Sequence, residues 1–389
     1  MNPFLRKILD ATHLTREGKL AEATAAIQRA LMRSAQAGAH SGASRTSAPA
    51  DAAVIDIPAG ERAATVDEAP RQAAVVVEPA APRAVKSSGS GRFLASSFTG
   101  ADGTRAFKLF VPGGFEGEAL PLVVMLHGCT QDPDDFAAGT RMNALAQEQG
   151  FVVLYPAQAP RSNSHKCWNW FSPRDQRRGA GEPALLAGMT RHVLQTHSID
   201  RDRVFVAGLS AGGAMAAILA REYPDLFAAA GIHSGVAPGM ASDVPSAFAV
   251  MKSGPGVTPQ PLSLYAATRA GADAPARGPS VPVIVFHGDA DQTVAPANGD
   301  AVVSAAIGDS SAVMSTREAA AGSGARPYRR TVWHLDGDVG APSLAEQWVV
   351  GGAPHAWSGG AATGSYTDPA GPDASREMLR FFREHPRRV

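Results

Sequence analysis

The chain has 389 residues, enough for one large α/β domain with additional segments. Its 36 basic and 36 acidic side chains give a formal net charge of zero, so charge offers no basis for binding nucleic acid or an anionic membrane surface. The sequence has no run of about 20 apolar residues, and therefore predicts no membrane span.

Residues 1–35 carry a helical pattern. Leu20, Ala23, Ile27 and Leu31 recur on one helix face, which would pack on the protein itself or dock on a partner such as a hydrophobic polymer granule. Charged residues interrupt the first 20 positions, so the segment lacks the apolar core of a signal peptide. This absence predicts a cytoplasmic protein, with an extracellular location as the alternative.

The composition changes twice after this segment. Residues 36–91 are rich in Ala, Pro, Ser and Gly and predict a disordered linker. Residues 92–389 alternate short apolar runs with helical stretches, which predicts an α/β domain with a mainly parallel central sheet and helices on both faces. Residues 236–280 lack periodicity and predict an insertion over the carboxyl edge of the sheet. The predicted strands are 107–111, 122–126, 151–155, 204–207, 227–232, 283–286, 331–335 and 347–350. The predicted helices are 142–149, 182–196, 213–221 and 375–384.

One serine lies in a pattern typical of a nucleophile. Gly208-Leu209-Ser210-Ala211-Gly212 follows the predicted strand 204–207 and precedes a predicted helix. This G-x-S-x-G motif makes a sharp strand-to-helix turn that presents the serine oxygen at the edge of a sheet. Because a serine hydroxyl is a poor nucleophile, Ser210 needs a base and an acid that orients the base.

Asp291 and His355 are the predicted acid and base. Asp291 lies just past the strand 283–286, and His355 lies in a Gly/Pro-rich loop before the last helix. Loops at the carboxyl ends of parallel strands gather at one edge of the sheet, where sites of this fold class are found. Asp289 competes for the acid role, and we prefer Asp291 because it lies further into the loop.

Two backbone N–H groups are predicted to form an oxyanion hole. One is that of Ala211, the residue after the nucleophile. The other is that of Cys129, in His127-Gly128-Cys129-Thr130 after the strand 122–126.

The two cysteines, Cys129 and Cys167, are interpreted as free thiols, with a disulfide as the minority alternative. The sequence contains no cluster of Cys and His residues, and therefore predicts no metal site. The cluster Cys167-Trp168-Asn169-Trp170-Phe171 is unusually aromatic, and Trp168, Trp170 and Trp357 are candidate substrate-binding residues that packing would explain equally well.

These motifs together resemble the polyhydroxybutyrate (PHB) depolymerase family of esterases, which also contains feruloyl and acetylxylan esterases. The resemblance rests on Leu126-His127-Gly128-Cys129-Thr130-Gln131, Cys167-Trp168-Asn169-Trp170-Phe171, Gly208-Leu209-Ser210-Ala211-Gly212-Gly213 and His355-Ala356-Trp357-Ser358-Gly359-Gly360, and covers residues 92–384. It implies an α/β-hydrolase fold, a Ser210-Asp291-His355 triad, and ester hydrolysis without a metal or organic cofactor.

The expected function is therefore that of a serine esterase acting through an acyl-enzyme. Short-chain polyesters such as poly(3-hydroxybutyrate), or their oligomers, are the preferred substrate class. A feruloyl or acetylxylan esterase is the second interpretation. A polymer-granule-tethered interaction protein is the third, and the complete triad argues against it.

Overall fold

The computed structural model describes residues 90–387, apart from residue 116 and residues 256–280, 309–311, 320–323 and 336–342. The predicted N-terminal helix at 1–35, nearly all of the predicted linker at 36–91, and most of the predicted insertion lie outside the described residues. Among the described helices, none is long and apolar enough to cross a membrane.

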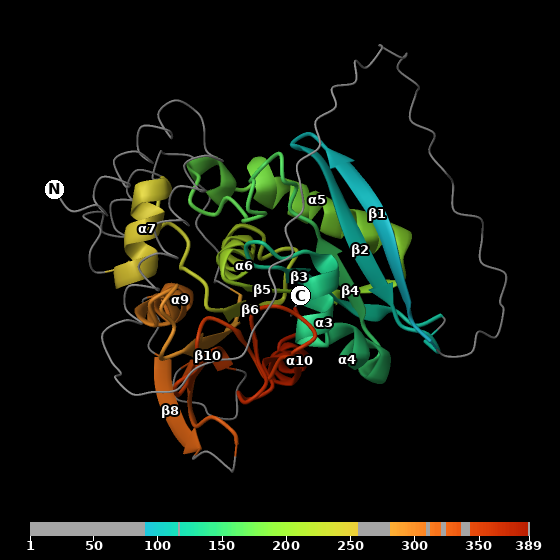
Figure 1. The fold of residues 1–389 in the computed structure, drawn as a ribbon. Coiled ribbons are helices and arrows are strands. Elements are labelled where there is room, and N and C mark those ends of the chain that lie inside the picture. The colour runs from blue at the N-terminus through green and yellow to red at the C-terminus, as the bar shows by residue number, and fades with distance from the viewer. Residues whose placement is uncertain are drawn as a thin grey trace, which may run out of the picture.

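A ten-stranded sheet organises the described part of the chain (Figure 1). Its spatial order is β1-β2-β4-β3-β5-β6-β7-β10-β9-β8. The six adjacent strands β4, β3, β5, β6, β7 and β10 are parallel to one another. The pair β1 and β2 at one edge and the pair β9 and β8 at the other are antiparallel. The strands are β1 Arg92–Gly100, β2 Gly103–Val111, β3 Leu120–Leu126, β4 Val152–Pro156, β5 Ile199–Leu209, β6 Ala229–His233, β7 Val283–Gly288, β8 Ala312–Ala319, β9 Tyr328–Leu335 and β10 Ser343–Val350, with β11 Trp357–Ser358 and β12 Thr367–Asp368 forming a small separate pair.

Helices cover both faces of the sheet because its central strands are apolar on both faces. In β3, Leu122 and Val124 pack with α5 and α6, whereas Val123 and Met125 point to the opposite face and pack with α3, α4 and α10. The helices are α3 Pro133–Thr140, α4 Met142–Gln149, α5 Gly181–Thr196, α6 Ala211–Glu222, α7 Val244–Ser253, α9 Ala297–Ile307 and α10 Ala374–Glu384, with the short 3₁₀ turn η1 at Pro173–Gln176.

The mainly parallel sheet with two helical layers confirms the predicted fold class. All eight predicted strands and four predicted helices are present, most with shifted ends. The sequence prediction missed the edge strands β1 and β8, the short pair β11 and β12, and the helices α3, α7 and α9. The strands β1 and β8 lie at the two edges of the large sheet, where exposed side chains remove the apolar runs that reveal a buried strand. The helix α7 lies within residues 236–280, for which the sequence predicted an insertion without assigning a helix.

The carboxyl ends of the parallel strands bring the predicted site together. The loops after β3, β5, β7 and β10 contain Cys129, Ser210, Asp291 and His355. The three loops that contain the predicted triad follow β5, β7 and β10. These strands lie within the four adjacent strands β5, β6, β7 and β10 of the sheet, so the loops begin close together.

Candidate active site

Ser210 occupies a constrained turn between β5 and α6. Its φ of 58° and ψ of −119° lie where a non-glycine residue rarely occurs, and such strain is typical of functional positions. The flanking glycines are required by space: a β-carbon on Gly208 would lie 2.4 Å from the Gly212 backbone, and one on Gly212 would lie 2.0 Å from the Leu126 carbonyl oxygen. The strand-turn-helix geometry predicted from the motif is therefore present.

Asp291 and His355 meet across two loops. His355 Nδ1 donates a hydrogen bond of 2.7 Å to Asp291 Oδ2. The loops are held in close contact, since a β-carbon on Gly288 would lie 2.2 Å from the Ala353 carbonyl oxygen. With its proton on Nδ1, the His355 ring has Nε2 available as an acceptor, which is the tautomer that a general base needs.

The carboxylate of Asp291 is completely buried and accepts three hydrogen bonds, one of them from His355. Its Oδ1 accepts from the backbone N–H groups of Thr293 at 2.8 Å and Val294 at 2.9 Å, and its Oδ2 also lies 3.5 Å from His287 Nε2. Burial alone would raise the pKa of Asp291, but the nearby His287 ring and the hydrogen bonds from His355 and Val294 outweigh it and hold the pKa well below its usual range. Asp291 is therefore ionised at any pH at which the enzyme would work.

Asp289, the competing acid, has a different role. Its Oδ1 accepts a 2.6 Å hydrogen bond from the backbone N–H of Gly352, three residues before His355. Asp289 thus supports the loop that carries the imidazole, while Asp291 contacts the imidazole itself. The preference for Asp291 agrees with this geometry.

His233 links the serine turn to the histidine loop, and the sequence analysis missed it. Its carbonyl oxygen accepts from the Ser210 N–H at 2.8 Å, and its Nε2 accepts from the Ser358 N–H at 2.9 Å. Burial lowers the pKa of His233 to about 3, so the ring stays neutral and Nε2 remains an acceptor. The signal in the sequence was a histidine at the end of an apolar strand, followed by Ser234 and Gly235.

The structure brings the predicted acid and base into contact and places the serine at the end of β5, which β6 separates from β7 at the same edge of the sheet. No hydrogen bond joins the Ser210 hydroxyl to the His355 ring within the described residues. Catalytic hydrogen bonds are often long before substrate binds and shorten in the complex.

The loop after β3 lies directly beside the nucleophile. A β-carbon on Gly128 would lie 3.6 Å from the Ser210 β-carbon. The Gly128 N–H donates to Gln131 Oε1 at 2.9 Å, and so is already occupied. The Cys129 N–H has no hydrogen-bond partner among the described residues. The N–H of Ala211, the first residue of α6, has no carbonyl of the same helix to bind, because the helix has no preceding turn. These are the two groups predicted to bind an oxyanion.

Hydrogen bonds fix the direction of the Cys129 N–H. The carbonyl of Gly128, in the same peptide unit, accepts from His127 Nδ1 at 2.8 Å. His127 Nε2 accepts from the Gln158 N–H at 3.1 Å, and burial lowers the pKa of His127 to about 4, which keeps the ring neutral. On the other side, the Thr130 N–H donates to the His165 carbonyl at 2.6 Å. An oxyanion donor held in this way costs little reorganisation when charge develops.

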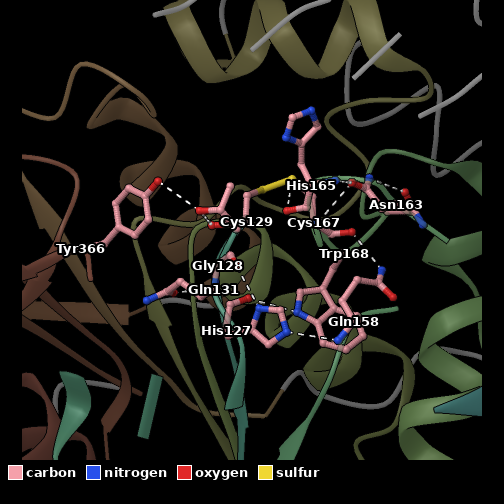
Figure 2. Close-up of a disulfide and its surroundings, with 12 residues drawn as sticks. His127, Gly128, Cys129, Gln131, Gln158, Asn163, His165, Cys167, Trp168 and Tyr366 are labelled. Carbon is pink, nitrogen blue, oxygen red and sulfur yellow. Dashed lines mark hydrogen bonds between the residues drawn. A yellow bond between two sulfur atoms is a disulfide. The ribbon is translucent and has the colours of Figure 1, made fainter. Parts of the chain in front are cut away.

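Cys129 and Cys167 form a disulfide, so the interpretation as free thiols is wrong (Figure 2). Their α-carbons lie 4.2 Å apart. The sequence could not decide this pairing because it depends on how the loop after β3 meets a segment 38 residues further along the chain. The bond attaches the predicted oxyanion loop to the aromatic segment.

The three tryptophans proposed as substrate contacts are buried, which contradicts that prediction. Trp168 is 0% exposed, Trp170 6% and Trp357 1%. Trp168 Nε1 donates to the His127 carbonyl at 3.1 Å, and Trp357 stacks on His233 with ring centres 5.1 Å apart. Trp168 and Trp357 therefore support the site from behind and present no surface to a substrate.

Over the described ranges, no group of three or more His, Cys, Asp or Glu side chains could hold a metal ion.

Comparison with known proteins gives the family. The family model described as Esterase PHB depolymerase matches residues 105–326. The chain belongs to this esterase family. It is 42% identical over 193 residues to poly(3-hydroxyalkanoate) depolymerase C of Paucimonas lemoignei, which covers 50% of the chain and 45% of that protein.

The chain is also similar to esterases that are named for other substrates. It is 38% identical over 128 residues to feruloyl esterase B of Thermothelomyces thermophilus, covering 33% of the chain and 43% of the relative. The chain thus spans less than half the length of the two curated relatives named. The solved acetyl xylan esterase from Aspergillus awamori superposes with a TM-score of 0.57 at 21% identity, covering 76% of the chain and all of that protein, and so has the same α/β-hydrolase fold.

Proposed function

We propose that this chain is a serine esterase that hydrolyses carboxylic esters through an acyl-enzyme. The observation that carries the proposal is the 2.7 Å hydrogen bond from His355 to the buried, ionised Asp291, at the same edge of the sheet as a serine held in a nucleophile turn. Membership of the esterase family supports the same reaction.

The proposed mechanism assigns one role to each group. His355 Nε2 removes the proton from Ser210 as its oxygen attacks the ester carbonyl, and Asp291 stabilises the imidazolium that forms. The N–H groups of Cys129 and Ala211 bind the oxyanion. His355 then protonates the departing alcohol, and a water molecule activated by the same ring releases the acid and restores Ser210.

Short-chain polyesters are the proposed substrates, with poly(3-hydroxybutyrate) or its oligomers as the preferred class. The similarity to poly(3-hydroxyalkanoate) depolymerase C favours this class. The similarity to feruloyl esterase B and to acetylxylan esterases favours carbohydrate-linked esters as the second candidate.

A matched panel of substrates separates these candidates. The panel contains 3-hydroxybutyrate oligomers, amorphous poly(3-hydroxybutyrate), methyl ferulate, acetylated xylan and p-nitrophenyl butyrate, and the measurement is kcat/KM for each soluble substrate and acid release for each polymer. We expect the hydroxybutyrate substrates to be preferred. Preference for ferulate or acetylxylan would assign the second candidate, and no hydrolysis of any ester would refute the proposal.

Granule contact through residues 1–35 is a further part of the proposal, supported by the spacing of Leu20, Ala23, Ile27 and Leu31 in the sequence, which predicts one apolar face if this segment is helical. We expect a chain that lacks residues 1–91 to sediment less with polymer granules than the full chain. Unchanged sedimentation would remove granule contact from the proposal. The reaction proposed for the catalytic domain does not depend on this contact.

We also propose that the protein works in an oxidising compartment, which favours the extracellular location over the cytoplasmic one. The support is the Cys129–Cys167 disulfide, a bond that persists in secreted proteins and is rare in the cytosol.

The disulfide itself can be tested by replacing both cysteines. Closing a loop of this length is worth about 4 kcal/mol in the chain-entropy description. We expect Cys129→Ala with Cys167→Ala to lower the free energy of unfolding by about that amount, and to lower esterase activity because the oxyanion loop loses one anchor. Chemical denaturation and kcat/KM measure the two effects. A reducing agent should weaken the original protein and leave the double variant unchanged; free thiols in the purified original protein would contradict the proposed compartment.

A further inference from the structure

Tyr366 is an exposed aromatic residue beside the predicted oxyanion loop. Four large apolar side chains are markedly exposed in the described part of the chain, and three of them, Leu94, Val313 and Met314, lie on the edge strands β1 and β8. Tyr366 is 44% exposed and lies instead next to the loop after β3, with its hydroxyl directed at that loop (Figure 2). Side chains on edge strands are commonly exposed, whereas an exposed aromatic side chain beside the predicted active site suggests a role in binding.

A short hydrogen-bond relay connects Tyr366 to Cys129. The Thr130 hydroxyl donates to the Cys129 carbonyl at 2.6 Å, and this uses its only proton. The Thr130 oxygen, 3.2 Å from the Tyr366 hydroxyl, must therefore accept from Tyr366. The tyrosine hydroxyl thus holds the residue that follows the predicted oxyanion donor.

The backbone around Tyr366 is anchored on both sides. The Tyr366 carbonyl accepts a 2.7 Å hydrogen bond from the N–H of Trp357, two residues after His355. The preceding residue, Ser365, donates from its N–H to Asp135 Oδ1 at 2.8 Å, and its carbonyl accepts from Gln131 Nε2 at 3.2 Å. Tyr366 therefore joins the loop of the base to the loop of the oxyanion hole.

The conformation of Tyr366 is also unusual. Its φ is 51°, a left-handed value that an aromatic residue rarely adopts, and Thr130, its hydrogen-bond partner, has a φ of 68°. Strained backbone of this kind persists only where the surroundings fix it, and it clusters at ligand sites. The fold thus holds the backbone and the hydroxyl of Tyr366 in place while leaving 44% of the residue exposed.

We infer that Tyr366 is a substrate-contact residue whose ring packs against the aliphatic part of the ester next to the scissile bond. This inference rests on the proposed esterase function and deepens it by naming a specificity residue. The buried Trp168 and Trp357 offer no comparable surface, whereas a fixed, exposed ring can cover methylene groups at little entropic cost. The ring would therefore favour esters whose acyl chain is long enough to reach it.

The test compares two esters on three variants. We expect Tyr366→Ala to lower kcat/KM on p-nitrophenyl butyrate about tenfold, mainly through KM, and to lower it less on p-nitrophenyl acetate, since the two added methylenes lose their contact. Tyr366→Phe keeps the ring and loses only the bond to Thr130, so it should keep the butyrate-to-acetate ratio while lowering kcat on both esters. Met314→Ala, at an exposed position on the remote strand β8, is the control for removing an exposed apolar side chain.

The outcomes are distinguishable from failure of the proposed function. A fall in the butyrate-to-acetate ratio for Tyr366→Ala alone supports the inference. An unchanged ratio, or equal losses on both esters in a variant with an unchanged melting temperature, overturns it and leaves the esterase proposal intact. If the original protein hydrolyses neither ester, the proposed function itself fails.

Discussion

Replacing Ser210 with alanine should reduce kcat by about a million-fold, the size of the loss seen when a triad serine is removed from a serine protease. The expected loss is this large because no other hydroxyl occupies the turn between β5 and α6, and because His355 then has no nucleophile to activate. The fold should survive, since the main structural bond of Ser210 is made by its backbone N–H to the His233 carbonyl. Steady-state hydrolysis of p-nitrophenyl butyrate measures the effect.

The matched control is Ser304→Ala. Ser304 lies on α9, is exposed, and is a serine far along the chain from the proposed triad. We expect it to keep activity within about twofold, as exposed substitutions rarely have larger effects. If Ser210→Ala in a folded sample retained activity near that of Ser304→Ala, the assignment of the nucleophile would be wrong.

Replacing Asp291 with asparagine should lower kcat by about 10⁴-fold, as in a serine protease whose triad aspartate is changed in this way. The asparagine oxygen can still accept from the N–H groups of Thr293 and Val294. Its NH₂ group then faces His355 Nδ1, and two donors cannot share that hydrogen bond. The ring responds by carrying its proton on Nε2, where it can no longer accept the proton of Ser210.

Asp289→Asn is the control for this substitution. Asp289 accepts only from the Gly352 N–H among the described residues, and an asparagine oxygen can accept in the same way. We expect activity within about threefold of the original protein, since one hydrogen bond to a backbone N–H is retained. Equal losses in the two variants would show that the region needs negative charge in general, and would contradict a specific role for Asp291 at the imidazole.

The sequence predicted the features that depend on local pattern. Ser210 was recognisable because a nucleophile turn needs small residues at fixed spacing, and Gly208 and Gly212 supply them. The central strands were recognisable because strands covered on both faces are continuously apolar. Asp291 followed from its position just after such a strand.

Other features depend on contacts between distant segments, and the sequence did not predict them. The disulfide requires Cys167 to reach the loop after β3, and nothing near either cysteine encodes that approach. Trp168 and Trp357 were ambiguous because an aromatic cluster looks the same whether it lines a site or packs behind one. Tyr366 and His233 were missed because their roles come from partners more than 100 residues away along the chain.

The disulfide has a consequence for survival among proteases. It closes a 38-residue separation that includes α3, α4 and β4. A single cut between Cys129 and Cys167 would therefore leave two fragments that remain one covalent molecule, with Cys129 still attached to the aromatic segment. Surface loops are where proteases cut first, and the loops on either side of the helices α3 and α4 lie within this enclosed stretch. A nicked chain of this kind keeps its oxyanion loop covalently attached, whereas a loop held by hydrogen bonds alone could separate after the same cut.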